Sequence, residues 1–177
     1  MGKRSNFQRV ERDFYPTPYE AVLPLLPHLP EGATFIEPCA GNGALVDHLQ
    51  DHGYKCLWAG DLVPLRRDIR MCDALTNIPV ALHHKMADLI ITNPPWNRDF
   101  LHPMIEVCVE SKTPTWLLFD ADWMHTKQSA DLIKSCVKIV SVGRVKWIPD
   151  SKMTGKDNCC WYLFDPNHTG PTEFYGR

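Results

Sequence analysis

Apolar runs alternate along this chain with segments in which apolar residues recur every three or four positions, the pattern of successive β–α–β units. The run at residues 87–92 is short and continuous, which is typical of a strand buried on both faces. Such runs predict strands over residues 33–38, 55–61, 87–92 and 115–121. Helical spacing predicts helices over residues 20–29, 43–53, 99–111 and 129–136, the first interrupted by two prolines.

Two further apolar runs, residues 137–148 and 158–166, are joined by a short polar segment. A connection of that length cannot contain a crossover helix, so the two runs predict an antiparallel pair of strands. The elements together predict an α/β fold: a Rossmann-like, mostly parallel sheet with an antiparallel strand at its C-terminal edge and helices on both faces. The 177 residues suit a single domain spanning residues 1–177.

Composition is that of an ordinary soluble protein, with 44% hydrophobic and 23% charged residues. No apolar run approaches the ~18 residues of a membrane span, and the polar, basic residues 1–12 are unlike a secretory signal. We therefore expect a cytoplasmic location and no membrane partner. The seven cysteines are odd in number and form no CxxC motif, so we expect reduced, mostly buried thiols and no metal site.

The net charge of −2 does not indicate a nucleic-acid binder, but the charges are unevenly distributed. Lysines and arginines concentrate in residues 1–12 and 134–156. These stretches could form a surface that faces phosphates, or they could be ordinary solvated surface. Charge alone favours the second interpretation.

Acidic residues are predicted at the carboxyl ends of strands, where ligands of such sheets bind. Glu37 ends the first strand directly before a turn in which Gly41 and Gly43 can adopt positive φ and let a ligand approach the backbone. Asp61 ends the second strand, and Asp73 lies at a further predicted strand end. Each acid alone is more simply a helix cap or turn residue. Together, beside one glycine turn, they predict a ligand site.

The glycine turn lacks the full dinucleotide motif, because Val46 stands where GxGxxG has its third glycine. No GxxxxGK[ST] sequence for phosphate binding occurs either. An acid at the end of the second strand suits the two hydroxyls of a ribose. We therefore expect a ligand that contains adenosine but no pyrophosphate.

The strand at residues 87–92 is followed by the sequence NPPW, residues 93–96. Pro94 and Pro95 cannot continue the strand, and a residue before proline is held extended, so Asn93 is presented rigidly at the top of the sheet. The Asn93 side chain and the next carbonyl make two acceptors for one –NH₂ group, and Trp96 offers a flat face for a ring. A proline-terminated strand with a Trp in a small hydrophobic cluster explains the tetrapeptide equally well.

Three motifs in order are DFYPTP at 13–18, EPCAGNG at 37–43 and NPPW at 93–96. Together they resemble the class I S-adenosylmethionine-dependent methyltransferases. Among these, the order is similar to the gamma-type adenine-N6 enzymes and to small phage-type DNA adenine methyltransferases. The resemblance covers about residues 11–125 with specific motifs, and it outweighs the alternative interpretation of NPPW.

The resemblance implies S-adenosyl-L-methionine as the cofactor. Thr17, with Tyr15, would bind the methionine carboxylate, and Glu37 would approach the methionine amino group. Asp61 would take the ribose hydroxyls, and Asp73 would accept from the adenine amine. The remaining residues that the resemblance assigns to the cofactor are Cys39, Gly41, Gly43 and Asn93.

For the substrate, the resemblance implies the N6 amine of adenine in DNA. Asn93 and the Pro94 carbonyl would hold the amine, Pro95 would complete the rigid corner, and Trp96 would stack on the base. Phe100, a weaker match, would pack on the other face of the base. The Pro38–Cys39 pair lies inside the cofactor loop, so we do not expect Cys39 to act as a nucleophile, and the transfer requires no metal.

A separate target-recognition domain is not expected, so sequence specificity would be low or limited to a short motif. The loop at residues 144–157 is the candidate DNA contact: Lys146, Lys152 and Lys156 would meet phosphates, and Trp147 would stack. An ordinary surface hairpin accounts for the loop equally well.

Other functions stay open on the sequence. Cytosine N4 and adenine in RNA present the same kind of amine. Glutamine-N5 methyltransferases share an NPP motif, but they carry an N-terminal helical domain for which this chain has too few residues before the glycine turn. A different class is a non-catalytic scaffold or partner subunit that keeps the cofactor fold.

Overall fold

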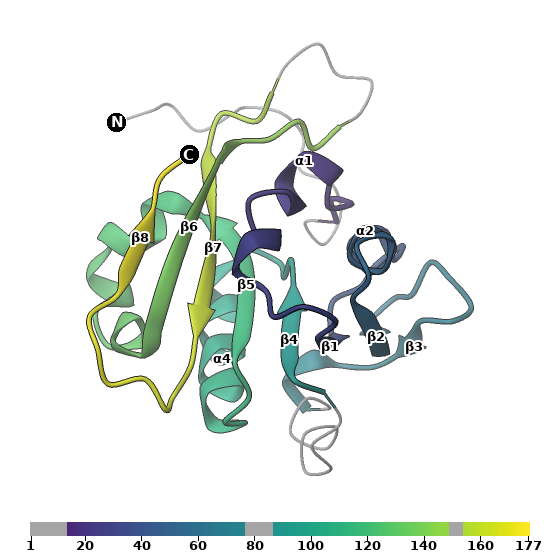
Figure 1. Cartoon of the computed structure of the whole chain (residues 1–177), viewed down its shortest axis with the longest axis horizontal. Coiled ribbons are helices and arrows are strands. Elements are labelled where there is room, and N and C mark those ends of the chain that lie inside the picture. Colours follow the sequence, from purple (N-terminus) through teal and green to yellow (C-terminus); the bar gives the residue numbers. More distant parts are fainter. Residues whose placement is uncertain (1–13, 77–86, 149–153) are drawn as a thin grey trace.

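The computed structural model describes residues 14–76, 87–148 and 154–177, and its main element is an eight-stranded sheet (Figure 1). The strand order is β3-β2-β1-β4-β5-β7-β6-β8. The strands are β1 (Thr34–Glu37), β2 (Lys55–Asp61), β3 (Arg70–Met71), β4 (Leu89–Thr92), β5 (Thr115–Asp120), β6 (Cys136–Arg144), β7 (Asn158–Phe164) and β8 (Glu173–Tyr175). Neighbouring strands pair in parallel except where β7 pairs with β5 and β6.

The mostly parallel sheet and the antiparallel pair of β6 and β7 confirm the predicted fold class. The antiparallel strand, however, is not at the edge. After β5, the segment 121–135 leads the chain to β6, which is not a direct neighbour of β5 in the sheet. β7 lies between these two strands and pairs with both. The edge is β8, which pairs in parallel with β6 and has three exposed residues.

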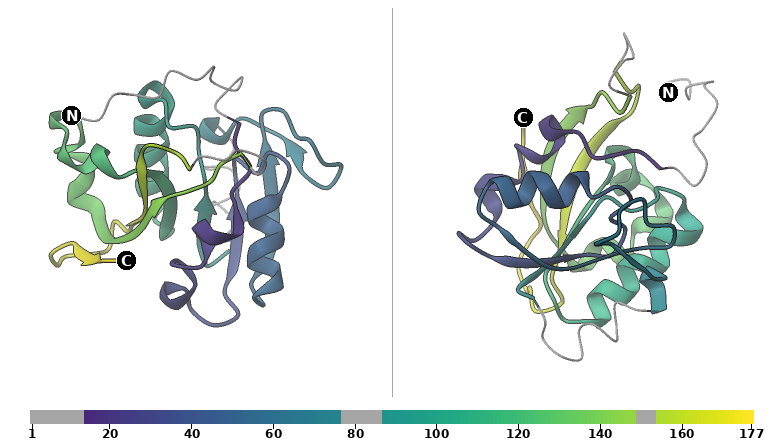
Figure 2. Two further views of the ribbon diagram at one scale, coloured as in Figure 1. Left: turned by 90° about the horizontal axis from the view of Figure 1, so that it is seen from above. Right: turned by 90° about the vertical axis from the view of Figure 1, so that its right-hand side faces the viewer.

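Helices cover both faces of the sheet, as Figure 2 shows. The helices α1 (Tyr19–Val22) and α2 (Ala44–Asp51) pack on one face, and α4 (Arg98–Glu110) packs on the other. Alternate strand residues divide between the two layers, because successive side chains point to opposite faces. In β1, Phe35 joins the cluster under α1 and α2, and Ile36 joins the cluster under α4.

Two predicted helices were wrong in form. Residues 20–29 form α1 and then a single 3-10 turn, η2 (Leu26–His28), because Pro24 and Pro27 lack the N–H groups that a continuous helix needs. Residues 129–136 contain the 3-10 turn η5 (Leu132–Ser135), after the similar turns η3 (Ala121–His125) and η4 (Lys127–Ser129). None of the helices in the described ranges has both the length and the apolarity needed to cross a membrane.

The fold brings three polar residues together at the carboxyl edge of the sheet. Glu37 ends β1, Asp61 ends β2 and Asn93 follows β4. Because β1 lies between β2 and β4, these side chains come from three adjacent strands at the same edge. A ligand at this edge can therefore contact all three.

Candidate functional site

The turn between β1 and α2 has the backbone conformation that its glycines favour. Gly41 has φ +53° and Gly43 has φ +81°, both in the region that residues with a Cβ rarely adopt. A Cβ on Gly41 would lie 2.5 Å from the ring of Phe14, and a Cβ on Gly43 would lie 2.5 Å from the guanidinium of Arg66. The turn therefore needs glycine for close packing as well as for its backbone angles.

Asp61 connects the end of β2 to this turn. One oxygen of its carboxylate, Oδ2, accepts from the backbone N–H of Gly41 at 2.7 Å. The other, Oδ1, accepts from the N–H of Val63 at 2.8 Å. Each carboxylate oxygen can accept a second hydrogen bond, so Asp61 retains capacity for hydroxyl donors. The residue thus shapes the turn and can still bind a ligand.

Glu37 is a buried acid at the centre of the site. Only 2% of its surface is exposed, and its Oε2 has no hydrogen-bond partner within the described residues. Burial, followed by the nearby charge of Asp61, raises the pKa of the Glu37 carboxyl well above its ordinary value, and Arg66 partly opposes this. Buried carboxyls without partners are costly, so this group favours a bound donor or cation.

The corner after β4 is tied to the segment that precedes α1. The Nδ2 of Asn93 donates to the Oγ1 of Thr17 at 3.2 Å and to the carbonyl of Tyr15 at 3.4 Å. The Oδ1 of Asn93 accepts from the indole N–H of Trp96 at 3.3 Å. The same N–H also donates to the carbonyl of Leu118 in β5 at 3.1 Å. Asn93 is thus held by residues on both sides.

Aromatic rings from three distant segments gather beside Asn93. Trp96 and Trp147 meet edge to face, with ring centroids 5.5 Å apart and an interplanar angle of 87°. Tyr15 lies 6.4 Å from Trp147 at 60°. Gly155 lies shortly before β7. A Cβ on Gly155 would lie 3.1 Å from the Trp147 ring, so the backbone at Gly155 packs closely on that ring. Phe100, by contrast, packs with the cluster under α4.

Comparison with solved structures identifies the architecture. A candidate RNA methyltransferase from Pyrococcus horikoshii matches with a TM-score of 0.55 and 17% identity, over 92% of this chain and 91% of that one. The modification subunit of a candidate type I restriction enzyme from Vibrio vulnificus matches with a TM-score of 0.59 and 14% identity, over 92% of this chain and 47% of the subunit. An S-adenosylmethionine-dependent methyltransferase from Agrobacterium tumefaciens matches with a TM-score of 0.53 and 12% identity, over 84% and 61%.

This is the class I S-adenosylmethionine-dependent methyltransferase fold. No family model matches the chain, and no curated protein matches it. The chain spans about half the length of the V. vulnificus subunit. At these identities the likeness concerns the fold alone.

The residues at the carboxyl edge of this methyltransferase fold suit its usual cofactor. S-adenosylmethionine carries an ammonium group, a ribose diol and an adenine ring. The Oε2 of Glu37, which has no hydrogen-bond partner among the residues that the structure describes, suits the ammonium, and Asp61 suits the diol. The turn at Gly41 and Gly43 offers backbone without side chains, with Phe14 and Arg66 as its neighbours.

The resemblance assigns Asp73 and Cys39 to the cofactor, and each of them also has local contacts that bear on that role. Asp73 is exposed, and its Oδ1 accepts from the N–H of Leu75 at 3.0 Å, the geometry of a turn or cap residue. Cys39 lies within the glycine loop, and burial raises the pKa of its thiol well above the ordinary value. A thiol in that state is a poor nucleophile, in line with its expected non-catalytic role.

The basic residues of the 144–157 loop are only partly described. Lys146 is half-buried next to Trp147, and Lys156 is exposed. Lys152 lies outside the described residues. No group of His, Cys, Asp and Glu side chains in the described ranges is arranged to hold a metal ion.

Side chains that the sequence patterns did not single out also border the site. Phe14 and Arg66 lie over the two glycines, and Arg66 forms ion pairs with Asp47 at 2.7 Å and Asp68 at 2.8 Å. Leu62, directly after Asp61, is 62% exposed. Two sequence signals could have pointed to these side chains. Leu62 directly follows Asp61, the acid at the end of β2, and Phe14 lies within the DFYPTP motif.

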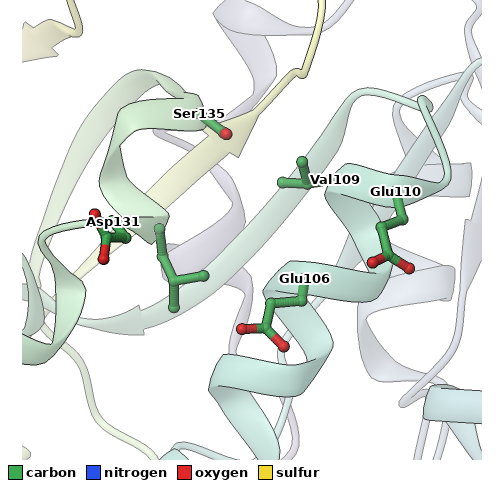
Figure 3. A pocket seen from close by; sticks show the side chains of 6 residues that line it. Glu106, Val109, Glu110, Asp131 and Ser135 are labelled. Carbon is green, nitrogen blue, oxygen red and sulfur yellow. The ribbon is translucent and has the colours of Figure 1, made fainter.

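A separate depression lies between the C-terminal half of α4 and η5, lined by Glu106, Val109, Glu110, Asp131, Leu132 and Ser135 (Figure 3). Its volume of about 220 Å³ is smaller than the roughly 300–1,000 Å³ of small-molecule sites. Because α4 starts at the carboxyl edge of the sheet and runs away from it, this depression is remote from the glycine turn. We assign it no role.

Proposed function

We propose that this protein transfers the methyl group of S-adenosylmethionine to the N6 amine of adenine in DNA. The observation that carries the proposal is the orientation of the Asn93 carboxamide. Its Nδ2 donates to Thr17, and its Oδ1 accepts from the indole N–H of Trp96, whose ring packs edge to face on Trp147. An acceptor beside flat rings suits a planar base that bears an exocyclic amine.

The cofactor is held by residues of β1, β2 and the loops that follow. The Glu37 carboxylate binds the methionine ammonium, and Asp61 binds the ribose hydroxyls. Leu62, exposed directly after Asp61, provides an apolar wall for the adenine ring. Asp73 accepts from the adenine amine, and the Gly41–Gly43 turn lets the cofactor lie against the backbone, where it would displace the Phe14 ring that packs on Gly41.

When bound, S-adenosylmethionine supplies an electrophilic methyl group on a sulfonium sulfur. Asn93 Oδ1 and the Pro94 carbonyl, which lies beyond the end of β4 at Thr92, accept from the two hydrogens of the target amine. These bonds would favour a tetrahedral target nitrogen with an available lone pair. In the transfer that the bound cofactor would supply, an N–C bond would form as the S–C bond breaks, and the extra proton would pass to water. Holding the two reactants in line supplies much of the rate.

Contact with DNA involves the connection between β6 and β7, residues 144–157. Trp147 lies next to Trp96 and Tyr15, so it faces the space that a base would enter. Lys146, Lys152 and Lys156 neutralise phosphates. A base in duplex DNA has to be flipped out to reach this corner, and stacking on aromatic rings offsets part of that cost.

The test is transfer of tritium from labelled S-adenosylmethionine to double- and single-stranded DNA. We expect transfer by the wild-type protein and a loss of at least about 100-fold in Asn93→Ala, in the range found when a positioned polar group at a reacting centre is removed. Asn97→Ala is the control, because Asn97 is exposed and only caps α4 through the N–H of Asp99.

Binding of S-adenosylhomocysteine by Asn93→Ala would show that the variant is folded and loaded. Absence of transfer to any DNA at saturating cofactor would contradict the proposal. Label recovered as N4-methylcytosine, or only in RNA, would assign the same chemistry to another amine. Cofactor binding without transfer to any nucleic acid would favour a partner subunit, and no cofactor binding would favour a scaffold.

A further inference from the structure

The Asn93 carboxamide has two nearly equivalent orientations, and only one can serve the proposed reaction. A half-turn of the group exchanges its oxygen and its –NH₂ with little change of shape. With the oxygen toward the target, Asn93 accepts from the amine. In the turned orientation, two donors would face each other and the amine would lose one of its acceptors.

Two partners of Asn93 distinguish these orientations, because each has only one hydrogen-bonding role. The Tyr15 carbonyl can only accept, and it faces Nδ2 at 3.4 Å. The Trp96 indole N–H can only donate, and it faces Oδ1 at 3.3 Å. The Thr17 hydroxyl can do either, so it holds the near end of the group without choosing the orientation.

These partners are themselves fixed. The Trp96 N–H also donates to Leu118 of β5 at 3.1 Å, and the Trp96 ring packs on Trp147. Thr17 is buried, with 5% of its surface exposed, and its Oγ1 lies 3.2 Å from Nδ2. The carboxamide oxygen has two lone pairs, so it can accept from Trp96 and from a target amine at the same time.

Resting on the proposed function, we infer that Trp96 and Thr17 are positioning residues: Trp96 keeps the Asn93 carboxamide with its oxygen toward the target amine, and Thr17 holds its nitrogen end in place. Trp96 thereby has a polar role in addition to stacking. Thr17 acts on Asn93 from the opposite side, which differs from the role of methionine carboxylate ligand that its motif implied. The segment before α1 is thus linked directly to the methyl-transfer corner.

Three variants separate these roles. Trp96→Phe keeps an aromatic ring and removes the N–H. Thr17→Val keeps the size of the side chain and removes the hydroxyl, whereas Thr17→Ser keeps the hydroxyl. Trp123→Phe is the matched control, because it also removes an indole N–H, which donates to His102 at 3.0 Å and makes no hydrogen bond to Asn93 in the described contacts.

The measurements are the single-turnover rate of methyl transfer at saturating DNA and the affinity for S-adenosylhomocysteine. We expect Trp96→Phe and Thr17→Val each to slow transfer about tenfold, the effect of one neutral hydrogen bond, with cofactor affinity within about twofold. Thr17→Ser should keep most of the rate. The double variant should lose less than the product of the single losses, because both residues act on one carboxamide.

Unchanged rates in both single variants would overturn the inference. A Thr17→Val protein with a normal rate but weakened cofactor binding would instead make Thr17 a cofactor ligand. Transfer slowed as much in Trp123→Phe as in Trp96→Phe would show that the Trp96 effect is a general loss of packing and would overturn the inference.

A nuclear magnetic resonance measurement tests the same contacts without any enzymatic activity. The Asn93 side-chain NH₂ should exchange slowly with water in the wild type and faster in Thr17→Val. Fast exchange in the wild type would overturn the inference even if methyl transfer occurs. Slow exchange in a protein that transfers no methyl group to DNA would support the hydrogen bonds and would refute only the proposed function.

Discussion

The buried carboxyl of Glu37 should make stability depend on pH in a way that Glu37→Gln removes. Burial and Asp61 raise the pKa of Glu37 well above its ordinary value of 4.5, so the folded protein holds a proton that the unfolded chain releases. The resulting stability is fully present below the unfolded pKa. It is lost as pH rises through the folded pKa, and above that value the cost of a buried carboxylate is complete.

One proton limits the effect to about 1.4 kcal/mol per pH unit within that window. Glutamine keeps the shape of glutamate and cannot ionise, so Glu37→Gln should be more stable than the wild type by an amount that grows with pH and then levels off. The charged groups that act on Glu37, namely Asp61, Arg66 and Asp47, are present in both proteins and largely cancel in the comparison.

The assay is urea unfolding of both proteins at intervals between about pH 5 and pH 8, the range in which such linkage is expected. A difference in unfolding free energy that stays constant over the whole range would refute the reasoning. Cofactor binding gives a second readout: the methionine ammonium favours the ionised carboxyl, so binding should release protons. Calorimetry in two buffers of different ionisation enthalpy should detect this release in the wild type and not in Glu37→Gln.

Two further predictions concern the glycine loop. Gly53→Ala, outside the loop and just after the C-terminal end of α2, is the reference and should cost about 1 kcal/mol, because φ is +85° but no described atom beyond its chain neighbours lies within 4 Å of the new Cβ. Gly43→Ala should cost more and weaken cofactor binding, because its Cβ would displace Arg66; equal losses of unfolding free energy in the two variants would contradict this. Cys39→Ala should retain methyl transfer, and the wild-type thiol should react slowly with iodoacetamide at neutral pH, because burial raises its pKa. A loss of transfer in Cys39→Ala with intact cofactor binding would instead indicate a covalent role.

Most strands and the two main sheet-covering helices were predictable from hydrophobic patterning. The predicted strand 55–61 coincides with β2, and α2 and α4 lie within two residues of their predicted bounds. β8 was not predictable, because an exposed three-residue edge strand has no buried face to create a pattern. The position of β7 inside the sheet depends on pairing between distant segments, which local spacing does not encode.

Part of the candidate site could likewise be predicted from the sequence, and part depends on packing between distant segments. Glu37, Asp61 and Asn93 could be placed together from strand ends alone, because parallel strands share a carboxyl edge. The contact of Thr17 with Asn93 joins residues 76 positions apart and depends on how the first segment packs over the sheet. Trp147 reaches Trp96 through the packing of the hairpin. Asp73 combines a local contact, in which its Oδ1 accepts from the N–H of Leu75, with a role toward the adenine amine that stays a prediction.

The most direct test of the proposed function is mass spectrometry of nucleosides from DNA incubated with the protein and S-adenosylmethionine that carries a deuterated methyl group. We predict deuterated N6-methyladenine from the wild-type protein and none from Asn93→Ala. If the wild-type protein, shown by calorimetry to bind S-adenosylhomocysteine, leaves every adenine of double- and single-stranded DNA unlabelled, it is not a DNA adenine methyltransferase.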